Sequence, residues 1–346
     1  MTMQTERSIT IEDVALAAGV SRAAVSKVIR DAYGVSPQMR ARVEAAINEL
    51  GYRPRAAARA MRGSSFTIGV EIPTVHNHFF SKIIDGATTA LVDTRYQVII
   101  APADPHHDEG PQAIEALADR QVDGIVAISS RVPQTWLEKL AVRVPLVMIG
   151  RHHQAEHYDT LVGDDVLGAE LAVQHLFELG HRRIVHLTLD EGRGAAPGTP
   201  HMMRVVGYRQ KMADLGLEPE IVWVKPVQGE SLQAARDLLS RVDAPVGILA
   251  GHDELALEVL QAVAERGLTA AQASVVGYDD TDVAAHPMIS LTSVNQSGTQ
   301  MGAIAVRLLL ERIAGRTASA HEVLTPRVMA RNSSASPAHE PEGSHH

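Results

Sequence analysis

The sequence of 346 residues contains no cysteine, and aromatic residues make up only 3 % of it. Without cysteine the chain has no disulfide scaffold, no Cys-ligated zinc, no iron–sulfur cluster and no thiol nucleophile. No run of about 18 apolar residues is present, so the sequence offers no transmembrane helix and we expect no membrane partner. The first eight residues lack the apolar stretch of a secretory signal. These absences favour a cytoplasmic protein.

Motifs for catalysis and cofactor binding are also missing. The sequence has no P-loop, no G-x-S-x-G elbow and no G-x-G-x-x-G fingerprint, so we expect neither an enzyme nor a cofactor. Two histidine-rich stretches, 104–108 and 152–157, contain residue types that bind metals, with solvated loops as the alternative. We favour loops and predict no metal site.

Charge is distributed unevenly along the chain. Residues 1–62 contain ten Lys and Arg against six Asp and Glu, whereas the whole chain has a net charge of −9. A small basic head on an acidic body suggests that only the head meets a polyanion, although chance variation in a short segment is the alternative.

Residues 10–51 show the pattern of three short helices. Thr10 has the spacing of an N-cap, apolar residues recur at i, i+3, i+4 and i+7, and Gly19 ends the first helix. Ser21 caps a second helix over 22–30, and the third begins at Ser36. The second helix is predicted to turn outward Arg22, Ala23, Ser26, Lys27 and Arg30. This arrangement predicts a DNA-binding helix-turn-helix, with a plain helical bundle as the alternative.

The head resembles the DNA-binding domain of the LacI/GalR family, the lactose-repressor and galactose-repressor family of bacterial transcription regulators. The similar stretches are T-I-E-D-V-A-L-A-A-G-V-S, V-S-K-V-I, V-S-P-Q-M-R-A-R-V and E-L-G-Y-R-P. The resemblance implies that Arg22 and Ala23 read bases, and that serines contact phosphates. The full set of expected DNA-contacting residues is Thr10, Ser21, Arg22, Ala23, Ser26, Lys27, Arg30, Arg59 and Met61.

Three residues depart from the family pattern in this head. Ala24 replaces a threonine, Lys27 replaces an arginine and Arg30 stands where asparagine is common. Lysine lacks the bidentate geometry with which arginine recognises guanine. We therefore do not carry over the usual operator sequence.

The segment R-P-R-A-A-A-R-A-M-R at residues 53–62 has high helix propensity, but a helix that starts at Pro54 would be only about eight residues long. A helix that short is marginal in water, so we predict a segment that folds on binding, with a plain linker as the alternative. The resemblance implies a hinge helix that pairs with its dimer mate on DNA. Met61 then occupies the position of the family's minor-groove leucine.

The rest of the chain alternates apolar runs with amphipathic stretches, which predicts two doubly wound lobes with parallel sheets. Strands are expected at 66–72, 96–101, 124–129, 146–150, 160–163, 183–189, 221–225, 246–250 and 274–278. Helices are expected at about 80–93, 111–120, 166–180, 202–215, 230–241, 253–266 and 298–314. The predicted organisation is a head at 1–52, a hinge at 53–65, a two-lobed body at 66–334 and a disordered tail at 335–346.

The body resembles the periplasmic-binding-protein-like effector domain of the same family. The similar phrases are I-G-V-E-I-P, V-D-G-I-V, V-P-L-V-M-I-G-R, L-G-H-R-R-I, R-V-V-G-Y-R, H-D-E-L-A-L, S-V-V-G-Y-D-D and L-T-S-V-N-Q-S. The resemblance implies that the lobes exchange chain segments near residues 160, 292 and 322, and that an effector binds between them.

Six residues are candidates for contacts with the effector. Phe79 and Phe80 can stack on a ring, with packing at a helix start as the alternative. By family position Arg204 points into the cleft and Asp253 accepts hydrogen bonds from hydroxyl groups, although Asp253 also fits a helix N-terminal acid. The complete set is Phe79, Phe80, Arg151, Arg204, Asp253 and Gln296. Gly150 stands where the family often has an aspartate.

These observations predict a cytoplasmic, nucleoid-associated transcription regulator that acts as a repressor. It is expected to bind a pseudo-palindromic operator as a homodimer and to be controlled by a sugar, sugar acid or sugar phosphate, with a nucleobase-like ligand as the second choice. Two other classes stay open at this point. One is a solute-binding protein without a DNA role, and the other is an α/β enzyme of sugar or nucleotide metabolism.

Overall fold

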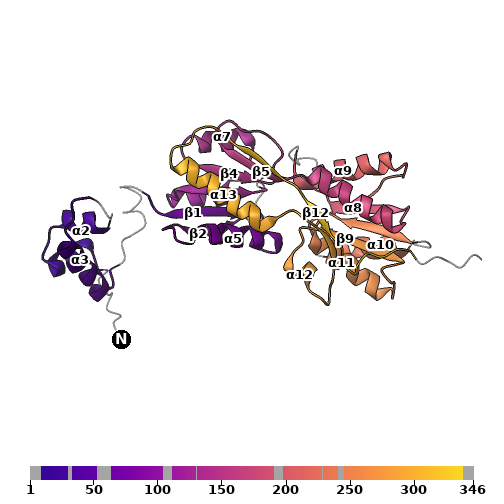
Figure 1. Ribbon diagram of the computed structural model, residues 1–346, viewed down its shortest axis with the longest axis horizontal. Coiled ribbons are helices and arrows are strands. Elements are labelled where there is room, and N and C mark those ends of the chain that lie inside the picture. Colours follow the sequence, from indigo (N-terminus) through magenta and orange to yellow (C-terminus); the bar gives the residue numbers. More distant parts are fainter. Residues whose placement is uncertain are drawn as a thin grey trace, which may run out of the picture. The chain divides into compact units, whose positions relative to one another are not determined.

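The computed structural model describes residues 9–29, 33–52, 64–103, 111–129, 131–190, 198–227, 229–240 and 245–337. The chain forms two compact units, the head at Met1–Ser65 and the body at Phe66–His346 (Figure 1). No described helix is long and apolar enough to cross a bilayer.

The head consists of three helices around a small apolar core. They are α1 at Ile11–Ala18, α2 at Arg22–Ile29 and α3 at Pro37–Leu50. Gly19 and Gly51 end the first and third helices in the left-handed conformation, with φ of 62° and 61°. The buried core residues are Val14, Ala15, Ala18, Val25, Val28, Val43 and Ala46. These apolar residues recur at helical spacing, which is why three such short helices hold together.

The body contains two six-stranded sheets. The first, in the order β11-β5-β4-β3-β1-β2, defines the N-lobe and is parallel throughout. Its strands are β1 Thr67–Ile72, β2 Gln97–Pro102, β3 Gly124–Ile128, β4 Leu146–Ile149, β5 Asp159–Gly163 and β11 His321–Leu324.

The second sheet defines the C-lobe and has the order β12-β10-β9-β8-β6-β7, in which only β12 runs antiparallel to its neighbour. Its strands are β6 Ile184–Leu189, β7 Glu220–Val224, β8 Val246–Ala250, β9 Ala273–Tyr278, β10 Thr292–Asn295 and β12 Arg327–Met329. The prediction of two lobes with parallel sheets is therefore confirmed, with one short antiparallel edge strand that the sequence pattern did not indicate.

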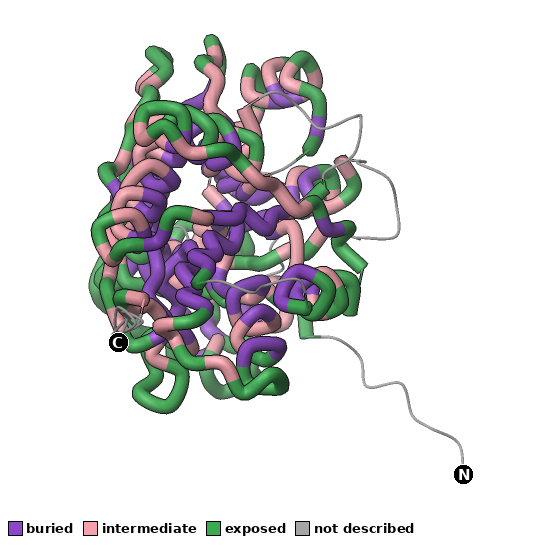
Figure 2. Tube along the Cα trace, turned by 90° about the vertical axis from the view of Figure 1, so that its right-hand side faces the viewer, coloured by how far each residue is buried: buried purple, intermediate pink, exposed green. Residues whose placement is uncertain are grey.

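Helices cover both faces of each sheet, and the buried residues belong mainly to the inner strands and to the inward sides of these helices (Figure 2). The N-lobe has α5 Phe79–Ala90, α6 Gln112–Asp119, α7 Gln134–Ala141 and α13 Gly298–Ile313. The C-lobe has α8 Asp165–Leu179, α9 Pro200–Asp214, α10 Glu230–Ser240, α11 Asp253–Glu265 and α12 Asp282–Ala285. This two-sided cover explains why the strands read as continuous apolar runs.

The chain passes between the lobes three times. It leaves the N-lobe sheet after β5, returns to that lobe after β10, and crosses again between β11 and β12. These crossings lie where the sequence predicted them. The elements that the pattern missed are short: α7, α12, β10, β11 and β12.

The ordered body extends past residue 334, where the sequence predicted a tail to start. The backbone of Ala335 exchanges hydrogen bonds with the hydroxyl of Ser274, with its nitrogen 2.9 Å and its oxygen 3.0 Å from Oγ. Residues 338–346 lie outside the described part of the chain.

Helices α5 and α13 pack backbone to backbone on one face of the N-lobe sheet. A Cβ built on Gly302 would lie 1.9 Å from the carbonyl oxygen of Ile83, and one built on Gly86 would lie 1.9 Å from that of Thr299. Only glycine fits at either position. This close approach places the start of α5 beside the start of α13, where the body has a polar pocket.

Candidate DNA-binding and effector sites

Capping side chains fix where α1 and α2 begin. Thr10 and Asp13 form a capping box, in which the Thr10 nitrogen donates to Asp13 Oδ2 over 2.7 Å. The Ser21 hydroxyl then accepts a hydrogen bond from the backbone nitrogen of Ala24 over 3.2 Å. Both capping predictions are confirmed, and the hydroxyl of Thr10 is engaged within its own helix.

The exposed face of α2 carries a cationic pair of residues. Ser21, Arg22, Ala23 and Lys27 are exposed. Arg22 also reaches back to α1, where its Nη1 lies 3.1 Å from Glu12 Oε1, and both side chains stay more than half exposed. An exposed pair of this kind contributes little to stability, so Arg22 remains available to a stronger acceptor.

Ser26 is a correction to the predicted outward face of α2. Its relative exposure is 8 %, which makes it buried. The physical reason is its spacing, because Ser26 follows Val25 and precedes Ile29 on the inward i, i+3, i+4 stripe of the helix. Arg30, Arg59 and Met61, as well as residues 53–63 of the predicted hinge, lie outside the described residues.

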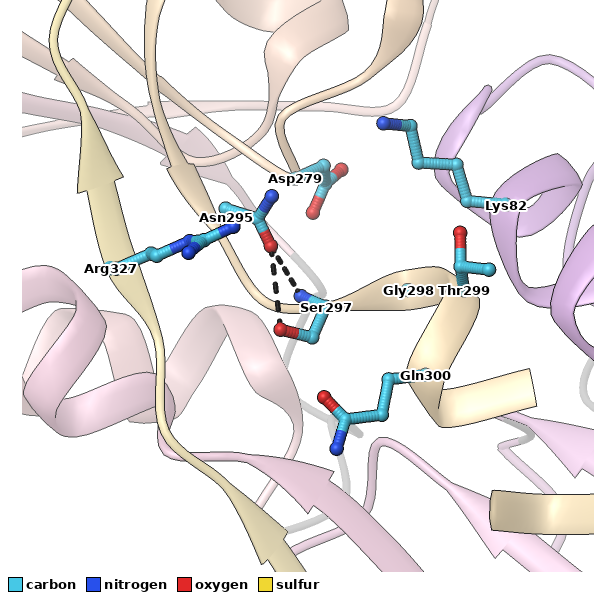
Figure 3. Close-up of a pocket in the computed structure, with 8 residues that line it drawn as sticks. All are labelled: Lys82, Asp279, Asn295, Ser297, Gly298, Thr299, Gln300 and Arg327. Carbon is cyan, nitrogen blue, oxygen red and sulfur yellow. Dashed lines mark hydrogen bonds between the residues drawn. The ribbon is translucent and has the colours of Figure 1, made fainter. Parts of the chain in front are cut away.

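The body holds a polar pocket of about 220 Å³ (Figure 3). Its residues come from α5, from the loop after β9, from the chain crossing between β10 and α13, and from β12. The lining residues are Lys82, Asp279, Asn295, Ser297, Gly298, Thr299, Gln300 and Arg327. The pocket therefore lies beyond the carboxyl ends of strands and draws on both lobes, as ligand sites in doubly wound folds do.

Asp279 is the buried acid of this pocket, with a relative exposure of 3 %. Its Oδ1 accepts a hydrogen bond from Gln296 Nε2 over 2.5 Å, and its Oδ2 accepts one from Asn77 Nδ2 over 3.4 Å. Burial raises the pKa of Asp279 well above its ordinary value, while Arg204, 3.9 Å away, acts in the opposite direction. Its backbone has a φ of 111°, an uncommon conformation for a residue with a side chain.

Arg204 is buried behind Asp279 and fully engaged. Its Nε lies 2.8 Å from Asp165 Oδ1, and its Nη1 donates to the carbonyl oxygen of Gly251 over 2.5 Å. The guanidinium also lies over the ring of Tyr278, with Cζ 3.7 Å from the centroid. Arg204 thus lies behind the acid of the pocket and is not among the residues that line it, so its predicted contact with the effector stays a prediction.

Asp253, a predicted effector contact, is turned away from the pocket. Its Oδ2 accepts hydrogen bonds from the nitrogen and hydroxyl of Thr281 over 2.7 and 2.9 Å, and its Oδ1 accepts one from Ser293 over 2.6 Å. Asp253 is fully buried and ties the loop after β9 to α11. The acidic side chain that lines the pocket is Asp279, and the role of Asp253 as an effector contact stays a prediction.

The two phenylalanines and Arg151 pack within the N-lobe. Phe79 and Phe80 are buried in the core between the sheet, α5 and α13, which is the alternative named for them above. Arg151 is buried as well, and its Nη1 donates to the carbonyl oxygen of Val132 over 2.6 Å. None of the three is among the residues that line the pocket in Figure 3.

The histidines at 152–157 have protein partners. His152 Nε2 lies 2.7 Å from Asp165 Oδ2, His153 Nε2 lies 2.6 Å from the Tyr158 hydroxyl, and His157 pairs with Glu138. Among the described residues no group of three or more His, Cys, Asp or Glu could hold a metal ion. The other histidine-rich stretch, 104–108, lies outside the described part of the chain.

Contacts between the lobes converge on the start of α5. Asn77 reaches Asp279, the backbone nitrogen of His78 donates to Glu254 Oε1 over 2.9 Å, and Lys82 Nζ lies 3.1 Å from Asp282 Oδ1. Glu254 in turn lies 3.1 Å from His252 Nδ1. The segment that borders the pocket on the N-lobe side therefore also holds the C-lobe.

Comparison with known proteins identifies the chain. Residues 10–55 match the bacterial regulatory proteins of the lacI family, and residues 173–334 match the periplasmic binding protein-like domain. The ribose operon repressor of Escherichia coli is 32 % identical over 333 residues, which cover 94 % of this chain and 99 % of the relative. The chain belongs to the LacI family. It is therefore a DNA-binding regulatory protein, which excludes a solute-binding protein without a DNA role.

Solved structures of LacI-family members have the same architecture as this chain. The transcriptional regulator CelR in complex with cellobiose is 30 % identical, with a TM-score of 0.67 over 94 % of this chain and 99 % of that one. The lac repressor dimer bound to operator and an anti-inducer is 25 % identical, with a TM-score of 0.77 over 95 % and 100 %.

None of the eight lining residues was among the six predicted effector contacts, and Asp279 is the one whose place in the sequence carried a signal. It lies in the phrase S-V-V-G-Y-D-D, which carried the family resemblance without a role being given to either aspartate. The signal was its place directly after the predicted strand 274–278, because side chains at the carboxyl end of a parallel strand border the ligand crevice.

Proposed function

We propose that this LacI-family protein is a transcriptional repressor whose affinity for a pseudo-palindromic operator is set by a small, hydroxyl-rich effector in the interlobe pocket. The observation that carries the DNA-binding part is the exposed, cationic face of α2, which follows the tight Gly19 turn of a capped first helix. A helix presented in this way fits the major groove.

Within α2 we assign base contacts to Arg22 and Lys27, which are exposed, and close apolar contact to Ala23. Arg22 offers a bidentate fork to guanine once it leaves Glu12, whereas Lys27 offers a single point charge. Ser21 lies at the helix start, where hydroxyls meet phosphates. The roles expected of Arg30, Arg59 and Met61 stay proposals from the resemblance.

The effector part rests on the chemistry of the pocket. Its lining is polar, with carboxyl, amide, hydroxyl and cationic side chains, and such groups match the hydroxyls of a sugar or sugar derivative. The relatives support this choice, since one is named for the ribose operon and another was solved with cellobiose. We assign direct contact to Asp279 and Asn295, and the orientation of Asp279 to Gln296 and Arg204.

Control of DNA binding follows from the position of the pocket across the lobe boundary. An effector shifts the equilibrium between lobe arrangements only by binding one arrangement more tightly than the other. Here Asp279 is held by Asn77 from the other lobe, so a ligand that takes over Asp279 changes a contact between the lobes. The three chain crossings let the lobes move as two bodies about the segments that join them.

A homodimer is part of the proposal, because one recognition helix reads only half of a pseudo-palindromic site. The lac repressor, which resembles this chain over nearly its whole length, was solved as a dimer on its operator.

The test of the DNA-binding part is selection of binding sites from random duplexes with the purified protein, followed by binding measurements at several salt concentrations. We expect a two-fold symmetric consensus. Arg22→Ala should relax the preference at one base pair per half-site, by about 1–3 kcal/mol. Arg42→Ala on α3 removes an equal charge from another exposed position and serves as the matched control. Equal loss of preference in both variants would contradict the assignment of Arg22.

A further inference from the structure

The pocket carries more positive charge than a neutral sugar needs. Three of its eight lining residues are ionisable: Lys82, Arg327 and Asp279. Lys82 enters from α5 in the N-lobe, and Arg327 from β12 in the C-lobe. Figure 3 shows Arg327 reaching toward Asn295, and Lys82 extending toward the side of Asp279. The two cations therefore approach one space from different lobes.

Asp279 does not neutralise these cations. Its carboxyl accepts hydrogen bonds from Gln296 and Asn77 through its two oxygens, and burial raises its pKa well above the ordinary range. The buried cation on its inner side is Arg204, which lies 3.9 Å away and also pairs with Asp165. The charges of Lys82 and Arg327 thus remain for another partner.

The existing partner of Lys82 is weak. Asp282 lies 3.1 Å from Lys82 Nζ, but the Asp282 side chain is 92 % exposed whereas that of Lys82 is only 22 % exposed. A solvated carboxylate at the rim contributes little to such a pair. Arg327 is exposed, and it makes no ion pair within the part of the chain that the structure describes.

We propose that the effector carries an anionic group, a carboxylate or a phosphate, which binds between Lys82 and Arg327 while its hydroxyls face Asp279 and Asn295. The ligand class is thus a sugar acid or sugar phosphate of compact size, in keeping with a pocket of about 220 Å³. This inference rests on the proposed function and names the chemistry of its ligand.

The placement of the cations gives the anion a specific effect. One anionic group that contacts both Lys82 and Arg327 links the N-lobe to the C-lobe directly. Such a ligand binds tightly only when the lobes are close enough for both contacts, which is the differential affinity that a switch requires. A neutral sugar in the same pocket lacks this link.

The first experiment compares matched neutral and anionic ligands on the full-length protein at about 0.15 M salt. The probes are ribose, ribonate and ribose 5-phosphate, then glucose, gluconate and glucose 6-phosphate, each followed by thermal shift and calorimetry. We expect stabilisation by at least one anionic member and none by its neutral parent at the same concentration. Stabilisation by neutral sugars alone, or by no anionic member, overturns the inference.

The second experiment uses variants that separate charge recognition from a role in holding the lobes. Lys82→Gln and Arg327→Gln should each weaken binding of the anionic ligand about 10- to 100-fold, since charge-assisted hydrogen bonds are lost. Asp282→Asn removes the competing carboxylate but keeps Lys82, so it should leave the affinity unchanged or raise it. Lys139→Gln, on α7 away from the pocket, is the matched control.

The direction of the Asp282→Asn effect decides between the two roles. If Lys82 only ties the lobes through Asp282, then Lys82→Gln and Asp282→Asn weaken ligand binding together, and the inference fails. The proposed function is judged separately, because operator selection does not need the ligand. A specific operator combined with binding of neutral sugars alone keeps the repressor and rejects the anionic effector.

Discussion

Arg204 and Asp165 form an ion pair in the interior of the C-lobe, with Nε 2.8 Å from Oδ1 and both side chains no more than 5 % exposed. Asp165 also contacts His152, which comes from the N-lobe. The pair thus stands between a contact across the lobes on one side and the pocket acid Asp279 on the other.

Replacing Arg204 by methionine should therefore cost stability. The change removes the arginine partner of the buried Asp165 and leaves only the His152 ring beside it, so a loss of about 3–5 kcal/mol is expected, measured by chemical denaturation. Arg183→Met is the matched control, because Arg183 makes a two-pronged pair with Glu220 at 2.9 Å but both side chains are about 40 % exposed. That variant should lose no more than about 1 kcal/mol. Similar losses of stability in both variants would contradict the larger stabilising role that we assign to the buried pair of Arg204 and Asp165.

Glu71 predicts a dependence of stability on pH. It lies in β1, is 3 % exposed, and accepts a hydrogen bond from the backbone nitrogen of Ile128 over 3.2 Å. Burial raises the pKa of Glu71 to about 8. The folded state therefore holds its proton more tightly than the unfolded state, and stability falls as the pH rises from about 4.5 to about 8.

Glu71→Gln should remove this loss, since glutamine keeps an oxygen for Ile128 but has no charge to bury. As the pH rises to 8, we expect the free energy of unfolding of the variant to increase relative to that of the native protein. The increase is at most about 5 kcal/mol, at about 1.36 kcal/mol per pKa unit. Denaturation at pH 5 and pH 8.5 measures the difference. Glu115→Gln, at an exposed position of α6, should show no such trend. If the difference in free energy of unfolding between Glu71→Gln and the native protein is the same at all pH values, Glu71 is not a buried carboxyl that stays neutral.

Gly302→Ala should disturb both the N-lobe and the pocket. The added Cβ would meet the carbonyl oxygen of Ile83, so α5 and α13 must move apart. We expect a loss of about 1–3 kcal/mol, typical of overpacking, together with weaker effector binding because both helix starts border the pocket. Arg307→Ala, on the exposed side of α13, is the control for adding alanine to this helix. Unchanged stability in Gly302→Ala would show that the helices tolerate separation.

Asp253→Asn tests whether this acid positions the pocket from behind. An asparagine places an amide nitrogen where a carboxylate oxygen now accepts from Ser293 or Thr281, so one buried hydrogen bond is lost, worth about 1–3 kcal/mol. Because Asp253 holds the loop that carries Asp279, effector affinity should fall as well. Calorimetry with the effector and thermal melting give the two readouts. Reduced affinity without any loss of stability would favour direct contact by Asp253 instead.

The sequence predicted the head and the inner strands well because their signals are local. Capping residues, glycine stops and apolar spacing decide where α1, α2 and α3 begin and end, and apolar runs mark strands that are buried on both faces. The short strands β11 and β12 have alternating or partial burial at a sheet edge, so their residues give no such run. Their pairing is decided by distant parts of the chain.

Two side chains at the candidate sites are oriented differently from what their spacing along the chain suggests. Asp253 follows strand β8 at the edge that faces the pocket, yet Thr281 and Ser293 turn its side chain inward. Ser26 borders the inward stripe of α2, and the packing of three helices covers it. In both cases residues far away in sequence determine what a side chain faces.

The threefold crossing of the chain has a consequence for biosynthesis. The N-lobe sheet is not complete until β11 at His321–Leu324 has been made, and the C-lobe sheet waits for β12 at Arg327–Met329. The head, in contrast, makes its contacts within Met1–Ser65. During synthesis from the N-terminus the three-helix unit can therefore fold early, whereas both lobes must close over long sequence separations at nearly the same late moment. A nascent chain on the ribosome should present a folded nucleic-acid-binding unit before it has any means of sensing a metabolite.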